Sequence, residues 1–123
     1  MPDKITLFLF MNDIETITKH IVEFRNERNW AQFHNAKDLA LALSIEAAEL
    51  NELFLWKTPA EVEVLNRERV AEELADVLVY AFFIAEKYDF DIQEIIMQKM
   101  IKNAAKYPVE KSRNLATKYT DLA

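Results

Sequence analysis

Two pairs of carboxylates at helical spacing are the residues of this chain best suited to chemistry. Glu46 and Glu49 form one pair, and Glu73 and Asp76 form the other. Residues three apart on an α-helix share a face, so each pair can point both acids the same way. Carboxylates in a partly dry place repel each other and lose hydration, and they therefore take up protons or bind a cation. If two helices bring the pairs together, the oxygen ligands suit Mg²⁺, with Mn²⁺ as the alternative.

The setting of the acids matters because glutamates at this spacing are common on exposed helix faces. Here both pairs lie on faces that otherwise carry apolar residues, namely Leu39, Ala42, Leu50 and Leu53 around Glu46, and Val77, Tyr80 and Phe83 beyond Asp76. The spacing alone favours exposed, solvated acids over a metal site. The apolar setting supports a metal site, so the two interpretations carry equal weight. A carboxylate-bridged di-iron site is excluded, because neither histidine has a glutamate three residues before it.

The amino-acid composition excludes several classes of protein and of site. The chain has 123 residues, of which 51% are hydrophobic, which suits one folded domain. A net charge of −6 argues against non-specific binding to nucleic acid. Cysteine is absent, so we expect neither disulfides nor a thiolate zinc site. The longest wholly apolar run, residues 77–85, is too short to span a membrane. We therefore expect a cytoplasmic protein without membrane or nucleic-acid partners.

The absence of glycine excludes two common phosphate-binding motifs. A P-loop and a dinucleotide-binding turn both need glycine, so that the backbone can approach a phosphate. A protein of this composition must handle phosphates through metal ions and cationic side chains.

The hydrophobic pattern predicts an all-α fold, a bundle of four to five helices in a single domain over residues 1–123. Asn35, Thr58 and Asp91 are candidate N-caps, and Pro59 follows Thr58 at the first helical position. Residues 1–11 are interpreted as an N-terminal arm and residues 109–123 as a polar tail. The expected helices cover residues 13–28, 36–56, 58–87 with a break near Leu65 and Asn66, and 91–106.

The run over residues 77–85 is apolar around the whole helix and must be covered on all sides. A bundle of this size has few fully interior positions. We therefore expect a homo-oligomer, as a dimer or a dimer of dimers.

Cationic and aromatic residues supply two further candidate sites. Lys99, Asn103 and Lys106 share a helix face and could grip phosphate oxygens, although lysines near a helix C-terminus also complement its dipole. Trp30, Trp56 and Tyr80 could stack on a base, and the alternative is ordinary core packing.

Several segments resemble the MazG-like all-α nucleotide pyrophosphohydrolases, and in particular their dCTP pyrophosphatase branch. The acid pairs resemble the metal motif of this family. The other similar segments are residues 24–34 (FRNERNWAQFH), 50–57 (LNELFLWK), 72–80 (EELADVLVY), 106–108 (KYP) and 118–120 (KYT). Together they extend over roughly residues 20 to 122.

The resemblance implies a reaction, a cofactor and a set of site residues. The protein would cleave a nucleoside triphosphate between the α and β phosphates, with dCTP or a related dNTP such as dATP as substrate, and would clean the nucleotide pool. Glu46, Glu49, Glu73 and Asp76 would hold Mg²⁺ and be the catalytic residues, in a protein that is a homotetramer or a dimer with a doubled fold. The base pocket would be Trp30, Trp56 and Tyr80, and the phosphate contacts would be Lys99 and Asn103, with Arg113, Lys118 and Tyr119 in the tail.

One difference from the family pattern affects the base. Relatives have a histidine in the first helix where this chain has Ile21. Loss of that polar group widens the expected substrates from dCTP to purine deoxynucleotides. The alternative function is a non-catalytic helical module that senses nucleotides or mediates oligomerisation.

Overall fold

The computed structural model describes residues 13–123, and the regular elements of this part of the chain are all helices. It contains six α-helices and two short 3₁₀ helices, with no strand among these residues. The all-α prediction is therefore confirmed. The expected N-terminal arm, residues 1–11, lies outside the described residues. The chain divides into two compact units, Met1–Asp89 and Phe90–Ala123, and each is described by itself. The single domain over residues 1–123 stays a prediction.

The first described helix, α2 (Ile14–Glu27), begins where the sequence predicts. The Asp13 carboxylate accepts a hydrogen bond from the backbone N–H of Glu15 at 2.8 Å and caps the helix. After α2, Asn29 has a φ of 53°, a left-handed conformation that asparagine tolerates. The short helix η1 (Trp30–Phe33) follows and leads to the next N-cap.

Helix α3 (Ala36–Glu52) carries the first acid pair. The side chain of Asn35 accepts from the backbone N–H of Asp38 at 2.9 Å, as its predicted capping role requires. The helix ends at Glu52, so the prediction that it continues to Trp56 was wrong. Residues 53–56 form successive turns with i to i−3 hydrogen bonds, and Trp56 then takes a φ of 62°. Glycine or asparagine usually occupies such a left-handed position, and here a tryptophan does, so the sequence does not reveal the end of the helix.

The predicted restart and break after α3 are confirmed. Thr58 accepts from the backbone N–H of Glu61 at 3.2 Å and caps the short helix α4 (Pro59–Val62). Asn66 then caps the long helix α5 (Arg67–Lys87), and its side chain accepts from two backbone N–H groups of the first turn. Helix α5 carries the second acid pair.

The second unit contains helix α6 (Ile92–Lys106), capped by the Asp91 carboxylate at 2.9 Å from the Glu94 N–H. The predicted polar tail contains two helical turns, α7 (Val109–Ser112) and η2 (Tyr119–Asp121). The rings of Tyr107 and Tyr119 meet edge to face at 5.9 Å. This contact holds the end of the tail against the end of α6.

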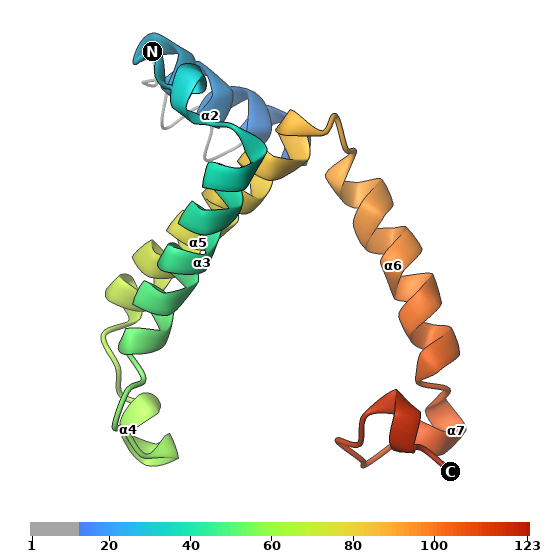
Figure 1. Cartoon of the computed structure of the whole chain (residues 1–123). Helices are drawn as coiled ribbons and strands as arrows, with labels where there is room; N and C mark the ends of the chain where they lie inside the picture. Colours follow the sequence, from blue (N-terminus) through green and yellow to red (C-terminus); the bar gives the residue numbers. More distant parts are fainter. Residues whose placement is uncertain (1–12) are drawn as a thin grey trace. The chain divides into compact units, whose positions relative to one another are not determined.

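In the first unit, α3 and α5 pack along each other and run in opposite directions, as Figure 1 shows. Helix α2 also contacts α5, and an ion pair joins Arg25 to Glu86 at 2.8 Å. The buried apolar side chains among the described residues are Leu39 on α3 and Phe83 and Ala85 on α5. The α3–α5 pair is therefore the framework that positions the acids.

The apolar run on α5 is only partly covered within the chain. Phe83 and Ala85 are buried, whereas the side chain of Leu78 is 50% exposed. No helix over residues 13–123 combines the length and the apolar character needed to cross a membrane.

Candidate metal centre

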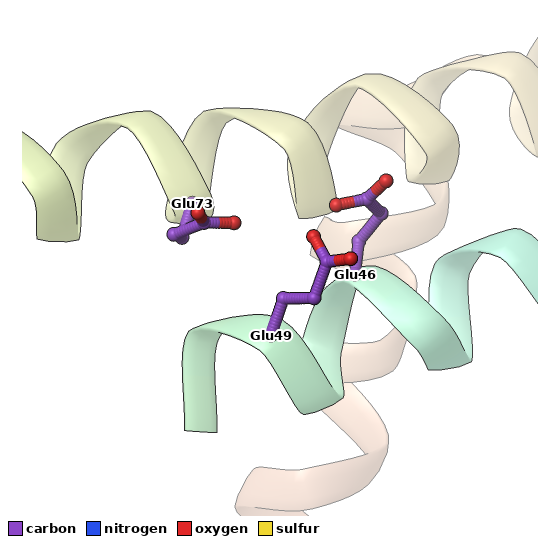
Figure 2. A group of neighbouring side chains, drawn as sticks. All are labelled: Glu46, Glu49 and Glu73. Carbon is purple, nitrogen blue, oxygen red and sulfur yellow. The ribbon is translucent and has the colours of Figure 1, made fainter. Parts of the chain in front are cut away.

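The opposite directions of α3 and α5 bring the two acid pairs face to face. Each pair lies on one side of its own helix, because its members are three residues apart. Glu46 and Glu49 come from α3 and Glu73 comes from α5, and Figure 2 shows their carboxylates in the space between the two ribbons. The predicted convergence of two helices is therefore realised within one chain.

Three of the four predicted ligands form a compact group. One carboxylate oxygen from each of Glu46, Glu49 and Glu73 lies within 4.8 Å of the other two. Oxygens that all bind one divalent cation lie at comparable separations, because each is about 2.0–2.6 Å from the ion. The group contains only oxygen ligands, which suit Mg²⁺ or Mn²⁺ rather than a soft metal.

Two oxygens of this group lack hydrogen-bond partners. Glu46 Oε2 and Glu73 Oε2 are both buried, and neither meets a donor among residues 13–123. A buried polar atom without a partner costs free energy, more so when it is charged. A bound cation would remove that cost, so the residues present fit a metal ion.

Crowding changes the acidity of Glu46. Burial of its carboxyl raises the pKa of Glu46 to about 7, assisted by a side-chain hydrogen bond with Glu49 and by the charges of Glu49, Asp76 and Glu73. Without a cation, this group therefore holds a proton at near-neutral pH. A divalent ion would replace that proton, because metal ligands must be ionised.

Asp76, the fourth predicted ligand, lies outside the compact group of three but close to it. It is exposed, and its charge helps to raise the pKa of Glu46. Burial and the charges of Glu46 and Asp76 also raise the pKa of Tyr80, so its hydroxyl stays protonated at neutral pH. Tyr80 thus borders the acids as a hydrogen-bond donor.

A cavity of about 520 Å³ adjoins the acids. Its volume lies in the range of small-molecule sites. It takes in two of the clustered acids and the connection between α3 and α5. The lining residues are Glu49, Glu52, Leu53, Lys57, Leu65, Asn66, Arg69, Val70 and Glu73.

Lys57 and Arg69 line this cavity and were not among the predicted site residues. Arg69 stands four residues before Glu73, so helical spacing could have identified it. Lys57 lies in the connection after α3. This segment has no helical period, so the sequence does not predict which way the side chain points.

A second cavity, of about 300 Å³, lies around His34, Arg25 and Glu86. The ring of His34 meets Phe83 at 5.0 Å and Tyr80 at 6.5 Å between centroids. Burial lowers the pKa of His34, as does the charge of Arg25, while Glu86 acts in the opposite direction. His34 is therefore neutral at physiological pH and supports Tyr80 by packing.

The aromatic residues predicted for a base pocket have different surroundings. Tyr80 is half-buried and packs against His34 and Phe83. Trp30 meets Phe24 edge to face at 5.9 Å. Trp56 is 92% exposed at the end of the α3 turn. The structure thus brings Tyr80 beside the acids, and the roles of Trp30 and Trp56 stay predictions.

The predicted phosphate contacts all belong to the second unit. Lys99 and Asn103 lie on α6, while Arg113 follows α7. Lys118 directly precedes η2, and Tyr119 begins it. Because this unit is described by itself, their part in the acid site stays a prediction.

Comparisons with known proteins converge on one family. The model of the MazG-like family matches residues 41–122. Rat dCTP pyrophosphatase 1 (Rattus norvegicus) is 42% identical, and the human protein of the same name (Homo sapiens) is 41% identical. Each alignment covers 89% of this chain and 67% of the relative. A pyrophosphatase structure from Archaeoglobus fulgidus is 40% identical with a TM-score of 0.73, covering 77% of this chain and 92% of that one.

Proposed function

This chain belongs to the MazG-like family, and on that premise we propose that it is a Mg²⁺-dependent nucleoside triphosphate pyrophosphohydrolase. The family assignment confirms the resemblance found in the sequence. The proposed substrate is a deoxynucleoside triphosphate, dCTP or a related one such as dATP. The anhydride bond between the α and β phosphates breaks with addition of water, and the products are the nucleoside monophosphate and pyrophosphate.

The observation that carries this proposal is the convergence of Glu46, Glu49 and Glu73 within 4.8 Å, with two buried oxygens that have no donor among the described residues. Together with Asp76, these glutamates would hold Mg²⁺. When bound, the ion lowers the pKa of water and offsets charge on the phosphates. The carboxylates orient the ion and keep it at the interface of α3 and α5.

For the nucleoside, we assign Tyr80, Trp30 and Trp56. Tyr80 borders the acids, and its protonated hydroxyl can donate to a sugar or a base. Trp56 is 92% exposed and holds a φ of 62°, an unfavourable conformation for a bulky residue. Strain of this kind gathers at binding sites, which supports a role for its indole in stacking.

For the phosphates, we assign Lys99 and Asn103 on α6, with Arg113, Lys118 and Tyr119 of the tail as further contacts. Lys99 and Asn103 lie on neighbouring turns of α6, and their ammonium and amide groups provide donors for phosphate oxygens. The Nζ atom of Lys106 lies 4.7 Å from the Tyr119 ring, a contact that orders this part of the tail.

We further propose that the protein acts as a homotetramer, a dimer of dimers, in the cytoplasm. Large apolar side chains on both site helices are half exposed, including Leu41 on α3 and Leu78 on α5. Covering such residues is the usual reason for oligomerisation.

The test is a turnover screen over common and modified deoxynucleoside triphosphates, with product identification by phosphorus NMR and with Mg²⁺ present. The proposal predicts equal amounts of monophosphate and pyrophosphate. Release of orthophosphate would contradict the cleavage position. Binding of nucleotide without turnover would instead indicate the nucleotide-sensing module.

A further inference from the structure

We propose that Lys57 and Arg69 form a subsite for the pyrophosphate end of the substrate, the β and γ phosphates. The subsite lies in the cavity beside the acid cluster. This inference rests on the proposed function and assigns two residues that the sequence did not single out.

The cavity places both cations next to the candidate metal ligands. Lys57 and Arg69 line the same space of about 520 Å³ as Glu49 and Glu73. All four residues belong to the first unit, so their arrangement depends on no other part of the chain. A phosphate chain bound to a cation at the acids would extend into this space.

Neither Lys57 nor Arg69 forms an ion pair with the described part of the chain. Three glutamates line the cavity with them, yet no carboxylate among residues 13–123 pairs with either cation. The lining carries three acids and two bases, so one divalent ion makes the net charge of the lining positive. A polyphosphate, and not a further cation, is the ligand that such a charged space attracts.

The order of residues along α5 gives the substrate a direction. Arg69, Glu73, Asp76 and Tyr80 follow one another at intervals of four, three and four residues and so lie on one helix face. Arg69 precedes Glu73 and Tyr80 follows Asp76, so along this face Arg69 and Tyr80 lie on opposite sides of the acids. A nucleotide with its nucleoside at Tyr80 and its α phosphate at the acids has its β and γ phosphates at Arg69.

Lys57 reaches the cavity from the connection that follows α3. Its backbone N–H donates to the carbonyl of Phe54 at 3.2 Å, directly after the left-handed residue Trp56. This turn positions the backbone of Lys57 in the connection, and its side chain lines the same cavity as Arg69.

Two backbone amides at the start of α5, those of Glu68 and Arg69, are not available for the same task. The side chain of Asn66 already accepts hydrogen bonds from the N–H groups of Glu68 and Arg69, at 3.0 and 3.3 Å. Recognition therefore falls to side chains, and the guanidinium of Arg69 can bind a phosphate through two parallel hydrogen bonds.

The experiment is calorimetric titration of the full chain with inorganic pyrophosphate in the presence of Mg²⁺. Arg69→Gln and Lys57→Gln should each weaken pyrophosphate binding by about tenfold, which corresponds to about 1.4 kcal/mol. The matched control is Arg67→Gln, because Arg67 is exposed on the same first turn of α5 and does not line the cavity. Unchanged pyrophosphate affinity in both cavity variants would overturn the subsite.

A second titration, with the nucleoside monophosphate, locates the contact along the substrate. The subsite predicts that Arg69→Gln leaves monophosphate affinity unchanged and raises the KM for the triphosphate. An equal loss for monophosphate and pyrophosphate would contradict the assigned direction.

Failure of the proposed function would give a separate result. Suppose that the wild-type chain binds pyrophosphate, that Arg69→Gln weakens this binding, and that the wild type turns over no triphosphate. This result would refute the catalytic proposal and support the subsite. Triphosphate turnover by the wild type, with unaltered pyrophosphate binding in both variants, would support the catalytic proposal and refute the subsite.

Discussion

At the scale of single residues, the acid cluster is a place where the protein tolerates an unfavourable arrangement. Glu46 has a pKa of about 7 because its carboxyl is buried and surrounded by other carboxylates. The group ionises readily in an unfolded chain, so the folded state binds more protons than the unfolded state between about pH 4.5 and 7. Stability of the metal-free protein should therefore fall as pH rises through this window.

Substitution of Glu46 tests this account of the cluster. In metal-free protein, Glu46→Gln should raise the free energy of unfolding at pH 8 by about 1–2 kcal/mol, less than the full pKa shift would give because solvent reaches the site. The gain should be much smaller at pH 5, where Glu46 is protonated in the folded wild type. Urea denaturation at both pH values measures it, and an equal gain at each pH would refute the electrostatic explanation.

The sequence indicated that the acids would come together, but it did not indicate that Lys57 lines the cavity beside them. Helical spacing on apolar faces identified Glu46, Glu49 and Glu73, because α-helices convert spacing into direction. It could not identify Lys57, since the side chain of a residue in an irregular connection has no direction until the connection is folded.

At the scale of elements, the α3–α5 pair holds the site, and an ion pair joins α2 to α5. Arg25 on α2 donates to Glu86 on α5 at 2.8 Å, and the Arg25 side chain is only 12% exposed. The guanidinium also lies 5.8 Å from the centre of the Phe83 ring. Removing the carboxylate would leave a mostly buried cation without its partner.

We therefore expect Glu86→Gln to lower the free energy of unfolding by about 1–3 kcal/mol, the range for a hydrogen bond between charged groups. Glu63→Gln, at an exposed glutamate after α4, is the control and should change stability little. Thermal and chemical denaturation with both variants measure the difference. Equal stability of the two variants would show that the ion pair does not fasten α2.

The element boundaries show where sequence reasoning succeeds. Asn35, Thr58 and Asp91 were predicted as caps, and each accepts a backbone hydrogen bond at its helix start. The end of α3 was missed because Trp56, an unusual residue for a left-handed turn, takes the place that glycine commonly has.

At the scale of the whole molecule, the described chain leaves much apolar surface to be covered. Only Leu39, Phe83 and Ala85 are buried hydrophobic residues among residues 13–123. Leu41 on α3 and Leu78 on α5 are 58% and 50% exposed. The sequence suggested this incomplete cover through the apolar run on α5, but a single sequence does not specify which faces meet in an oligomer.

The homo-oligomer can be tested by sedimentation equilibrium. Wild-type protein should have the mass of a tetramer, and Leu41→Glu or Leu78→Glu should produce smaller species, because a charge is costly in an apolar interface. Arg67→Gln is the control and should leave the mass unchanged. Retained far-UV circular dichroism would show that the variants fold. A monomeric wild type would contradict the oligomer.

We propose that the acid cluster makes the chain a metal-dependent pyrophosphohydrolase, and a comparison of two adjacent glutamates tests this proposal. Pyrophosphate release from the deoxynucleotide turned over best should be measured for the wild type, Glu73→Gln and Glu72→Gln, with Mg²⁺ and after chelation. Glu73 belongs to the cluster, whereas its exposed neighbour Glu72 does not. We expect pyrophosphate release to fall by about 100-fold or more for Glu73→Gln and for chelated protein, and to stay near the wild-type rate for Glu72→Gln. Wild-type release by Glu73→Gln, or release that survives chelation, would contradict the proposal.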